Sequence, residues 1–209
     1  MKSYLRFLSR NKLYTAIEVV GLSLALAFVI PMICFYTNIA RISKGHENYK
    51  NIYSLCVDHV QVSSPGFGDF LKERVPEIDK VTSPILNNVW YDIENTNRKI
   101  HYVDKDFFYF FPAKFSKGGI DFLDTPNSIA VSKEFADYLA KSGPVIGREI
   151  DHNSNRYIVH AVFDEYGSNV LSGCDILMNN EAIRKSGHND NIYGHRGSMT
   201  FFSVNPSAD

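Results

Sequence analysis

The sequence predicts an α+β fold in which one N-terminal membrane helix precedes a folded domain of mixed strands and helices. First, the 21 residues Val19–Ile39 contain no charged side chain. Second, from Ile52 onward short extended runs alternate with turn residues. Third, helical segments interrupt these runs without the regular rhythm of a parallel strand–helix–strand sheet, so the mixed class fits best.

The composition of the 209 residues is that of a globular protein, with 44% hydrophobic and 22% charged side chains. The net charge of −1 is unevenly spread. After residue 40 the chain carries 18 basic and 22 acidic residues. The first 40 residues carry one acidic side chain, Glu18, and four basic ones, Lys2, Arg6, Arg10 and Lys12. The domain is mildly acidic and has no basic patch, which argues against nucleic acid as a partner.

A helix over Val19–Ile39 would be ~31 Å long and would match a hydrocarbon core of about 30 Å. The basic residues upstream place the N-terminus in the cytoplasm. We therefore divide the chain into a cytoplasmic amphipathic segment over 1–15, a transmembrane helix over 16–40 and a domain outside the cytoplasmic membrane over 41–209.

Three other interpretations of this segment are weaker. Ala25–Ala27 could serve as a signal-peptide cleavage site, but the apolar run continues beyond it and Glu18 interrupts the apolar region. A lipoprotein signal needs a small residue before Cys34, and Ile33 is not small. A buried helix of a soluble domain would rarely hold 21 residues without a charge.

The segment over 1–15 mixes apolar and basic side chains, which is typical of a helix at the lipid interface. It could also contact a cytosolic partner. Glu18 is expected to be an interfacial carboxylate near Arg10 or Lys12, with a partner helix as the alternative.

In the first half of the domain, Ile52–Val57 is predicted to be a strand. Pro65-Gly66 should open a helix in which Phe67, Phe70, Leu71 and Val75 share one face and which Pro76 ends. Three further strands are expected at Val81–Leu86, Val89–Ile93 and Lys99–Val103, the last two forming a hairpin around the polar turn Glu94–Asn97.

In the second half, the strand Ser128–Val131 should lead into a helix with Ser132 as N-cap and Glu134 at its positive end. The apolar stripe of that helix would be Phe135, Ala136, Leu139 and Ala140, and Ser142–Pro144 would stop it. Arg156–Phe163 should be a strand with Tyr157, Val159, Ala161 and Phe163 on one face. Asp175–Met178 and Met199–Val204 complete the strands, and because no closing element follows we expect an incomplete domain.

No motif for catalysis or cofactor binding is present. The chain lacks G-x-x-x-x-G-K-[ST] and G-x-S-x-G, and Gly66 and Gly68 lack the third glycine of a dinucleotide site. Three cysteines are too few for a disulfide scaffold. Cys56 and Cys174 could pair in an oxidising compartment, but we favour small buried side chains.

No metal site is predicted either. His188, Asp190 and His195 lie in a polar segment whose spacing sets no coordination geometry, so a solvated loop is favoured over a zinc site. Asp151-His152 is expected to be a turn. The aromatic run Phe107–Phe111, with Phe115, is expected to form core, the alternative being an exposed docking patch.

Several segments in order resemble the MacB/FtsX-like permease subunits of ABC transporters, namely their first membrane helix and periplasmic core domain. The resemblance covers Arg10–Phe28, His46–Tyr53, Phe67–Ile78, Val103–Ile150 and Tyr157–Val162. It is specific as an ordered series, with Val103-Asp104, Asp106-Phe107-Phe108 and Asn127–Ser132 among its motifs.

The resemblance implies an inner-membrane permease that couples ATP hydrolysis by a cytosolic ABC ATPase to movement of a periplasmic domain. ATP would be bound by that partner, and this chain would carry no cofactor and no catalytic residue. Such subunits usually act as dimers, in contact with lipid and with periplasmic or outer-membrane proteins. No ATPase precedes the helix and no later spans follow, so we expect a fragment or a degenerate relative.

Three hypotheses therefore stand: a transport or mechanotransmission subunit, a single-pass anchored binding or sensor domain, and an anchored enzyme. The first fits the resemblance best. The sequence does not identify the substrate or the residues that would contact it.

Overall fold

The computed structural model describes residues 11–44, 51–56, 63–64, 66–164, 170–171, 173–180 and 198–205. The chain separates into two compact units, Met1–Gly45 and His46–Asp209. Each unit is described by itself.

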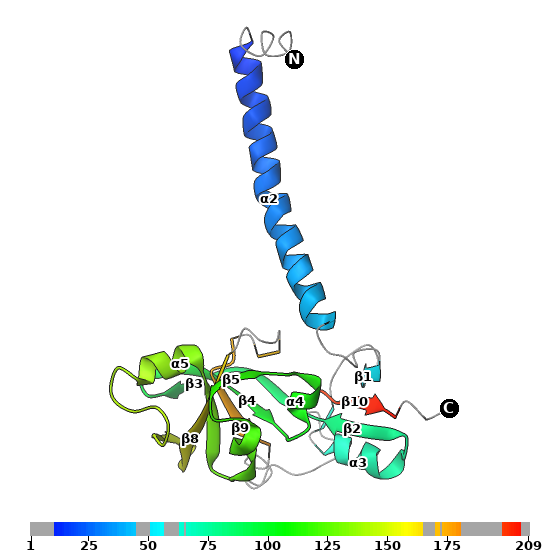
Figure 1. The fold of residues 1–209 in the computed structure, drawn as a ribbon, viewed down its shortest axis with the longest axis vertical. Helices are drawn as coiled ribbons and strands as arrows, with labels where there is room; N and C mark the ends of the chain where they lie inside the picture. The colour runs from blue at the N-terminus through cyan, green and yellow to red at the C-terminus, as the bar shows by residue number, and fades with distance from the viewer. Residues whose placement is uncertain are drawn as a thin grey trace. The chain divides into compact units, whose positions relative to one another are not determined.

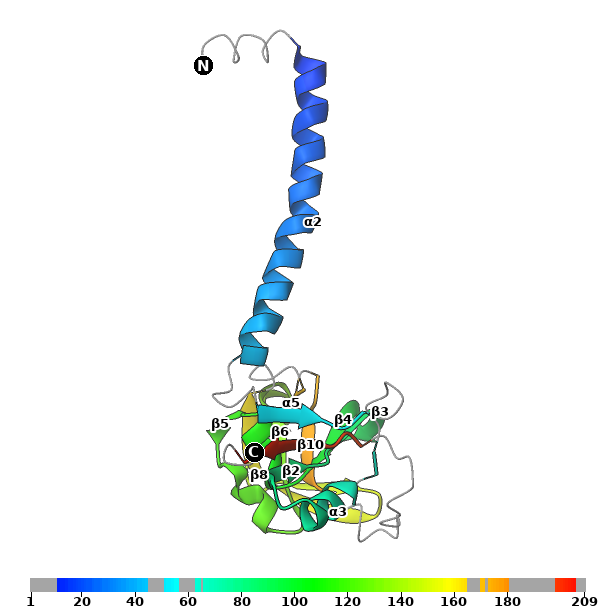
Figure 2. The same ribbon diagram turned by 90° about the vertical axis from the view of Figure 1, so that its right-hand side faces the viewer.

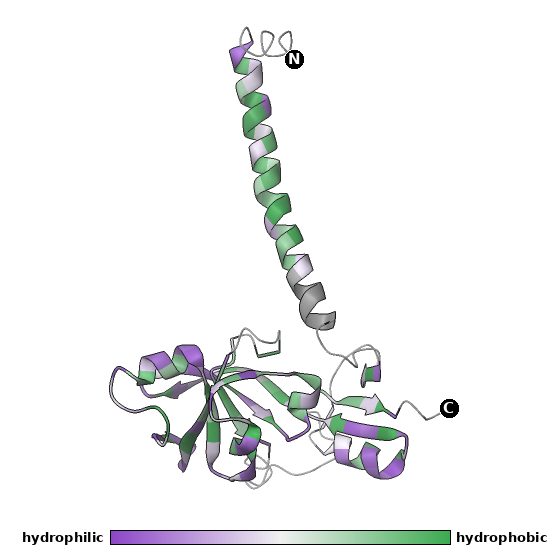
Figure 3. Ribbon diagram, in the orientation of Figure 1, coloured by the Kyte–Doolittle hydropathy of each residue, from purple (hydrophilic) through white to green (hydrophobic). Residues whose placement is uncertain are grey.

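The first unit is the long helix α2 (Lys12–Lys44). Its stretch Lys12–Thr37 is long and apolar enough to cross a membrane and has none of its residues buried (Figure 3). The hydroxyl of Ser23 donates to the carbonyl of Val19 at 2.6 Å, so this polar group is satisfied within the helix. The predicted span 16–40 lies inside α2, and the predicted interfacial segment lies mostly outside the described residues.

In the second unit, one set of described strands forms the large sheet (Figure 1), in the order β3-β4-β9-β6-β8-β5 with β7 also paired to β8. The strands are β3 (Ile85–Ile93), β4 (Thr96–Val103), β5 (Lys114–Lys117), β6 (Ser128–Ser132), β7 (Glu149–His152), β8 (Asn155–Asp164) and β9 (Ile176–Asn179). β4 runs parallel to β9 and β6 parallel to β8, and the other pairs are antiparallel. This mixture confirms the α+β class.

A second set forms the small sheet, in the order β1 (Ile52–Ser54), β10 (Phe201–Val204) and β2 (Ile78–Thr82). Helix α3 (Phe67–Arg74) lies against β2, as Figure 2 shows. The predicted helix after Pro65-Gly66 is confirmed, and its apolar residues are half-buried. The strand predicted over Met199–Val204 is confirmed in its second part.

The large sheet is buried on both faces. Helix α5 (Lys133–Leu139) covers one face, in a cluster that includes Ile100, Ile129, Val131, Phe135, Leu139, Ile176 and Met178. The opposite cluster holds helix α4 (Phe107–Phe110), the 3-10 helix η2 (Ile120–Asp124), and residues such as Val103, Phe107, Phe122, Ala130 and Leu177. Neighbouring residues of β6 and β9 therefore point into different cores, as expected for strands with a period of two.

The prediction that Tyr157, Val159, Ala161 and Phe163 share one face is wrong. All four are buried, but Tyr157 and Val159 belong to the cluster under α5, whereas Ala161 and Phe163 belong to the opposite one. The pairing with β6 jumps from Val159 to Ala161, which leaves His160 as an extra residue in β8. Such a bulge turns the following side chains to the other face.

The local prediction for α5 is confirmed. The Ser132 hydroxyl accepts a hydrogen bond from the backbone N–H of Phe135 at 3.1 Å, and Phe135, Ala136 and Leu139 are buried. Ala140, which was expected to join this stripe, is exposed. The Arg148 guanidinium donates to the carbonyl of Leu139 at 3.2 Å and satisfies a carbonyl at the end of the helix.

Two boundaries in the first half differ from expectation. Val81–Leu86 is not one strand: β2 ends at Thr82 and β3 begins at Ile85, because the chain passes from the small sheet to the large sheet at Ser83-Pro84. The β3–β4 hairpin is confirmed, but its turn is two residues long. Glu94 and Asn95 have φ of 54° and 59°, as a tight hairpin turn requires.

Asp151-His152 is not the predicted turn. Both residues belong to β7, and the turn is the next pair, Asn153-Ser154, with φ of 48° and 63°. His152 is buried with its ring edge-on to Tyr91 at a centroid distance of 5.0 Å, and this burial lowers the pKa of His152.

No disulfide joins cysteines in the part of the chain that the structure describes. Cys174 is buried as predicted, and its thiol lies 3.3 Å from the carbonyl of Ile176. Cys56 is exposed, so the expectation that both would be buried is wrong for Cys56.

A buried ion pair ties the hairpin to β9. Arg98 donates to Asp175 at 3.0 Å, and its guanidinium lies 4.5 Å from the ring centroid of Phe135. The second carboxylate oxygen of Asp175 accepts the backbone N–H of Lys99 at 2.9 Å. Removing either partner would leave an uncompensated charge in the interior.

We expect Arg98→Ala to lower the free energy of unfolding by about 3–5 kcal/mol, because Asp175 would remain buried without its cation. Denaturant unfolding of the full chain in detergent, followed by circular dichroism, measures this change. The matched control is Arg156→Ala, which removes exposed ion pairs with Glu149 and Asp151 and should cost less than about 1 kcal/mol. Equal losses in both variants would refute a structural role for burial at Arg98.

Candidate functional site

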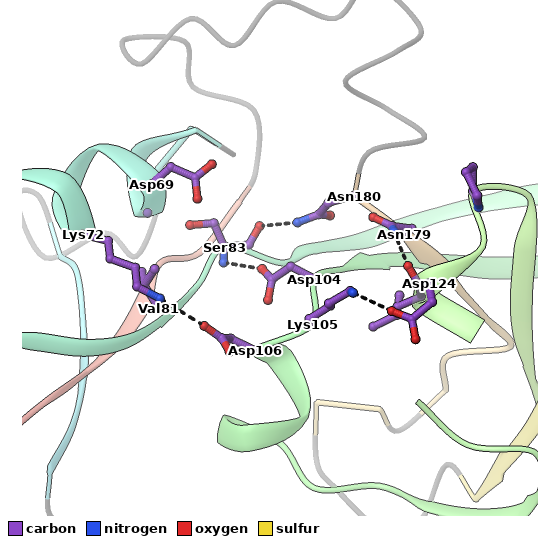
Figure 4. Close-up of a pocket in the computed structure, with 13 residues that line it drawn as sticks. Asp69, Lys72, Val81, Ser83, Asp104, Lys105, Asp106, Asp124, Asn179 and Asn180 are labelled. Carbon is purple, nitrogen blue, oxygen red and sulfur yellow. Dashed lines mark hydrogen bonds and ion pairs between the residues drawn. The ribbon is translucent and has the colours of Figure 1, made fainter. Parts of the chain in front are cut away.

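A pocket of about 380 Å³ opens in the second unit where the small and large sheets meet (Figure 4). Its wall on the small-sheet side comes from α3 and β2, and the wall on the large-sheet side comes from the ends of β4 and β9 and from η2. The lining residues are Gly68, Asp69, Lys72, Val81, Ser83, Asp104, Lys105, Asp106, Leu123, Asp124, Pro126, Asn179 and Asn180. The pocket is therefore mainly polar and carries charges of both signs.

Ion pairs neutralise the carboxylates at its rim. Asp106 lies 3.2 Å from the ammonium of Lys80 and 3.7 Å from that of Lys72. The hydrogen bond to Asp106 raises the pKa of Lys80. Asp124 pairs with Lys105 in the same way on the η2 side.

Asp104 lies deeper and is bound differently. Its Oδ2 accepts the hydroxyl of Thr82 at 2.8 Å and the backbone N–H of Ser83 at 3.0 Å. Its Oδ1 is enclosed and has no hydrogen-bond partner. Burial raises the pKa of Asp104, against the opposing effect of its hydrogen bonds.

Ser83 is the point where the hydrogen bonds of the junction converge. Its carbonyl accepts the amide of Asn180 and the hydroxyl of Ser198, both at 3.1 Å. Its hydroxyl lies 2.9 Å from the hydroxyl of Thr200. The Oδ1 of Asn180 is enclosed and has no partner, like that of Asp104. The side chains of Ser83, Asn180, Ser198 and Thr200 are all buried.

This arrangement does not resemble a catalytic site. The Ser83 hydroxyl pairs with another hydroxyl rather than with a base that could activate it. Among the described residues there is no group of three or more His, Cys, Asp or Glu side chains that could hold a metal ion. What the geometry provides is a directional polar contact between the two sheets.

The residues singled out from the sequence lie in different parts of the structure. Phe107 and Phe110 are buried, and Phe108, Phe111 and Phe115 pack partly buried beside them, which confirms the aromatic run as core. Glu18 lies on α2 outside the folded domain. His188, Asp190 and His195 lie outside the described residues.

The pocket is not predicted from the sequence. Asp104 belongs to a motif of the family resemblance, and no sequence motif singles out Asn180. The available signal was a polar residue at the end of a buried strand, at Asp104 directly after β4 and at Asn179-Asn180 where β9 ends. Since β4 and β9 are parallel neighbours, their carboxyl ends meet at one edge of the sheet.

A comparison with known protein families identifies the family of this chain. The profile of the family described as MacB-like periplasmic core domain matches residues 15–209. The chain belongs to this family. The predicted resemblance to the periplasmic core domain of MacB-like permeases is thus confirmed. A search of curated protein sequences found no significant match.

Solved structures share the fold at low identity. A domain of a protein assigned as a permease from Porphyromonas gingivalis matches with a TM-score of 0.56 and 16% identity, over 72% of this chain and 66% of that domain. The periplasmic region of MacB from Actinobacillus actinomycetemcomitans gives 0.54 and 11%, over 78% and 80%. The extracellular domain of the noncanonic ABC-type transporter YknZ from Gram-positive bacteria gives 0.51 and 12%, over 75% and 83%.

The buried charge of Asp104 leads to a prediction about pH. Because its folded-state pKa is raised above the unfolded value, folding favours the protonated form. This contribution to stability is fully present below the unfolded-state pKa and is lost as pH rises through the folded-state pKa.

Asp104→Asn removes the charge and keeps an oxygen for Thr82 and Ser83. We expect the variant to melt at a higher temperature than the wild-type chain near pH ~7.5, with the difference shrinking as the pH falls below the folded-state pKa. Thermal unfolding followed by circular dichroism across this pH range measures it. Asp121→Asn, at an exposed carboxylate paired with His160, is the control and should give no such gain. A variant that melts lower than wild type at every pH would contradict the prediction.

Proposed function

We propose that the chain is a permease subunit of a MacB/FtsX-type ABC transporter. Helix α2 crosses the cytoplasmic membrane with its N-terminus in the cytoplasm, and the domain His46–Asp209 lies outside. ATP hydrolysis by a separate cytosolic ABC ATPase drives movement of this domain. ATP binds to the partner, and this chain supplies no cofactor site of its own.

The observation that carries the proposal is the family match over residues 15–209, which includes both most of the apolar helix and the folded domain. A helix with 26 unburied residues that suit a bilayer supports membrane insertion. The basic residues before it support a cytoplasmic N-terminus. A second copy of the permease or a homologue, membrane lipid, and periplasmic or outer-membrane proteins complete the proposed partners.

A second candidate is an anchored binding or sensor domain. The observation that favours it is the polar pocket, whose volume of about 380 Å³ falls in the range of small-molecule sites. Its charged lining differs from the mainly apolar walls of such sites, so the transport proposal stands first.

The native cysteines test the topology. Cys56 is exposed at the start of the domain, whereas Cys174 is buried. We expect a membrane-impermeant maleimide to label Cys56 in intact cells with a permeabilised outer membrane, and Cys56→Ser to abolish that labelling. In the Cys56→Ser background, Lys12→Cys should react only after the inner membrane is lysed. Labelling of Lys12→Cys without lysis would reverse the proposed orientation.

Association with an ATPase tests the coupling role. Deletion of residues 1–12 should reduce recovery of the ABC ATPase with the tagged chain, because these residues form the proposed cytoplasmic contact. Co-purification in mild detergent measures the ratio of the two proteins. Lys141→Ala, which changes an exposed lysine of the domain outside the membrane, is the matched control. Undiminished recovery after the deletion would exclude this segment as the coupling contact.

A further inference from the structure

The two sheets of the domain have unequal cores. Both hydrophobic clusters of buried residues belong to the large sheet and the helices that cover it. Among the described strands of the small sheet, Ile78 and Val81 are the buried apolar residues. A three-stranded sheet needs a hydrophobic face or a helix packed against it to be stable. With two buried apolar residues and the short helix α3, the small sheet also depends on its contact with the rest of the domain.

That contact is built from buried polar groups. Ser63, Thr82, Ser83, Ser198 and Thr200 are each at least nine-tenths buried and are linked by the hydrogen bonds that converge on Ser83 and Asp104. An edge-on contact between Phe111 and Phe201, with centroids 4.9 Å apart, adds an aromatic component. Hydrogen bonds of this kind can be exchanged for bonds to water when the two sheets separate.

The closed contact also leaves two acceptors unsatisfied. The Oδ1 atoms of Asp104 and Asn180 are enclosed without a donor, although each of these side chains uses its other polar atom across the junction. A buried polar atom without a partner favours any state in which water reaches it. The pocket beside these residues lies between α3 and η2 (Figure 4).

We infer that the small sheet, with α3, is a hinged element latched to the large sheet by Asp104 and Ser83. The latch is closed when Asp104 holds Thr82 and Ser83 and the Ser83 carbonyl holds Asn180 and Ser198. When these bonds break, β1, β10, β2 and α3 move together relative to the large sheet. That such a movement is driven from the membrane helix rests on the proposed function, whereas the latch itself does not.

Helix α3 packs closely against Ser83 in the closed latch. A Cβ atom added to Gly68 in α3 would lie 2.5 Å from the Ser83 hydroxyl oxygen. A side chain at this position would therefore require the Ser83 hydroxyl or the neighbouring Val81 side chain to shift. The helix, the crossing at Ser83 and Asp104 are fixed relative to one another in the closed state.

Hydrogen–deuterium exchange of the full chain in nanodiscs tests the latch. Asp104→Ala removes both accepted bonds, and we expect about five-fold or greater acceleration of exchange throughout β1, β2 and β10, including the Leu55 amide that bonds to Thr200. Amides of β6 and β8 should be unchanged. Asp104→Asn keeps the accepting oxygen and should not accelerate exchange in the small sheet.

A second, milder variant tests the latch even if Asp104→Ala does not fold. Thr82→Val keeps the shape of the side chain and removes one donor to Asp104, so it should accelerate the same amides to a smaller extent. Asp121→Ala, at an exposed site on η2, is the matched control and should change neither sheet.

Two outcomes would overturn the inference. Equal acceleration in both sheets would show that Asp104 supports the fold as a whole rather than a latch. Acceleration confined to Thr82 and Ser83 would show that the rest of the small sheet is held by other contacts. Neither outcome bears on whether an ATPase binds the chain, so the proposed function can fail or stand separately.

Discussion

Burial of the large sheet on both faces is the constraint on which the rest of the domain depends. Each central strand has to supply apolar side chains to two cores at once, and β6 and β9 do so with nearly unbroken apolar runs. Polar groups are consequently displaced to the ends of these strands. The carboxyl ends of the parallel neighbours β4 and β9 thereby present Asp104 and Asn180 at one edge, where the small sheet meets them.

The same sheet contains a local irregularity. β8 changes face at His160, so that Tyr157 and Val159 pack in one core and Ala161 and Phe163 in the other. Gly118, directly after β5, leaves the space that the bulge at His160 needs. A Cβ atom there would lie 2.5 Å from the His160 carbonyl oxygen, and its φ of +65° suits glycine. The bulge therefore depends on a residue that is about forty positions away in sequence.

Features set by neighbouring residues could be predicted from the sequence. Three local features each depend on a few consecutive residues: the Ser132 cap, the end of α3 before Pro76 and the β3–β4 hairpin. The aromatic run after Asp106 was predicted to be buried because it is so strongly apolar. Features set by distant partners could not. The bulge at His160, the exposure of Cys56 and the junction at Ser83 arise from segments that meet only in the folded chain. Family membership followed from the order of motifs, whereas nothing in their spacing revealed that two of them line a pocket.

The pairing of β1 with β10 has a consequence for how the domain is made. Ile52 and Ser203 are partners in the small sheet although they are 151 residues apart in the chain. During synthesis, β1 emerges before β10, its partner in the small sheet, and β10 follows only after nearly the whole domain. The large sheet can begin to form from its hairpin and its β6–α5 unit well before that, because those contacts are local. The small sheet is thus the last part to assemble, and the exposed edge of β1 has the longest time in which to meet a wrong partner.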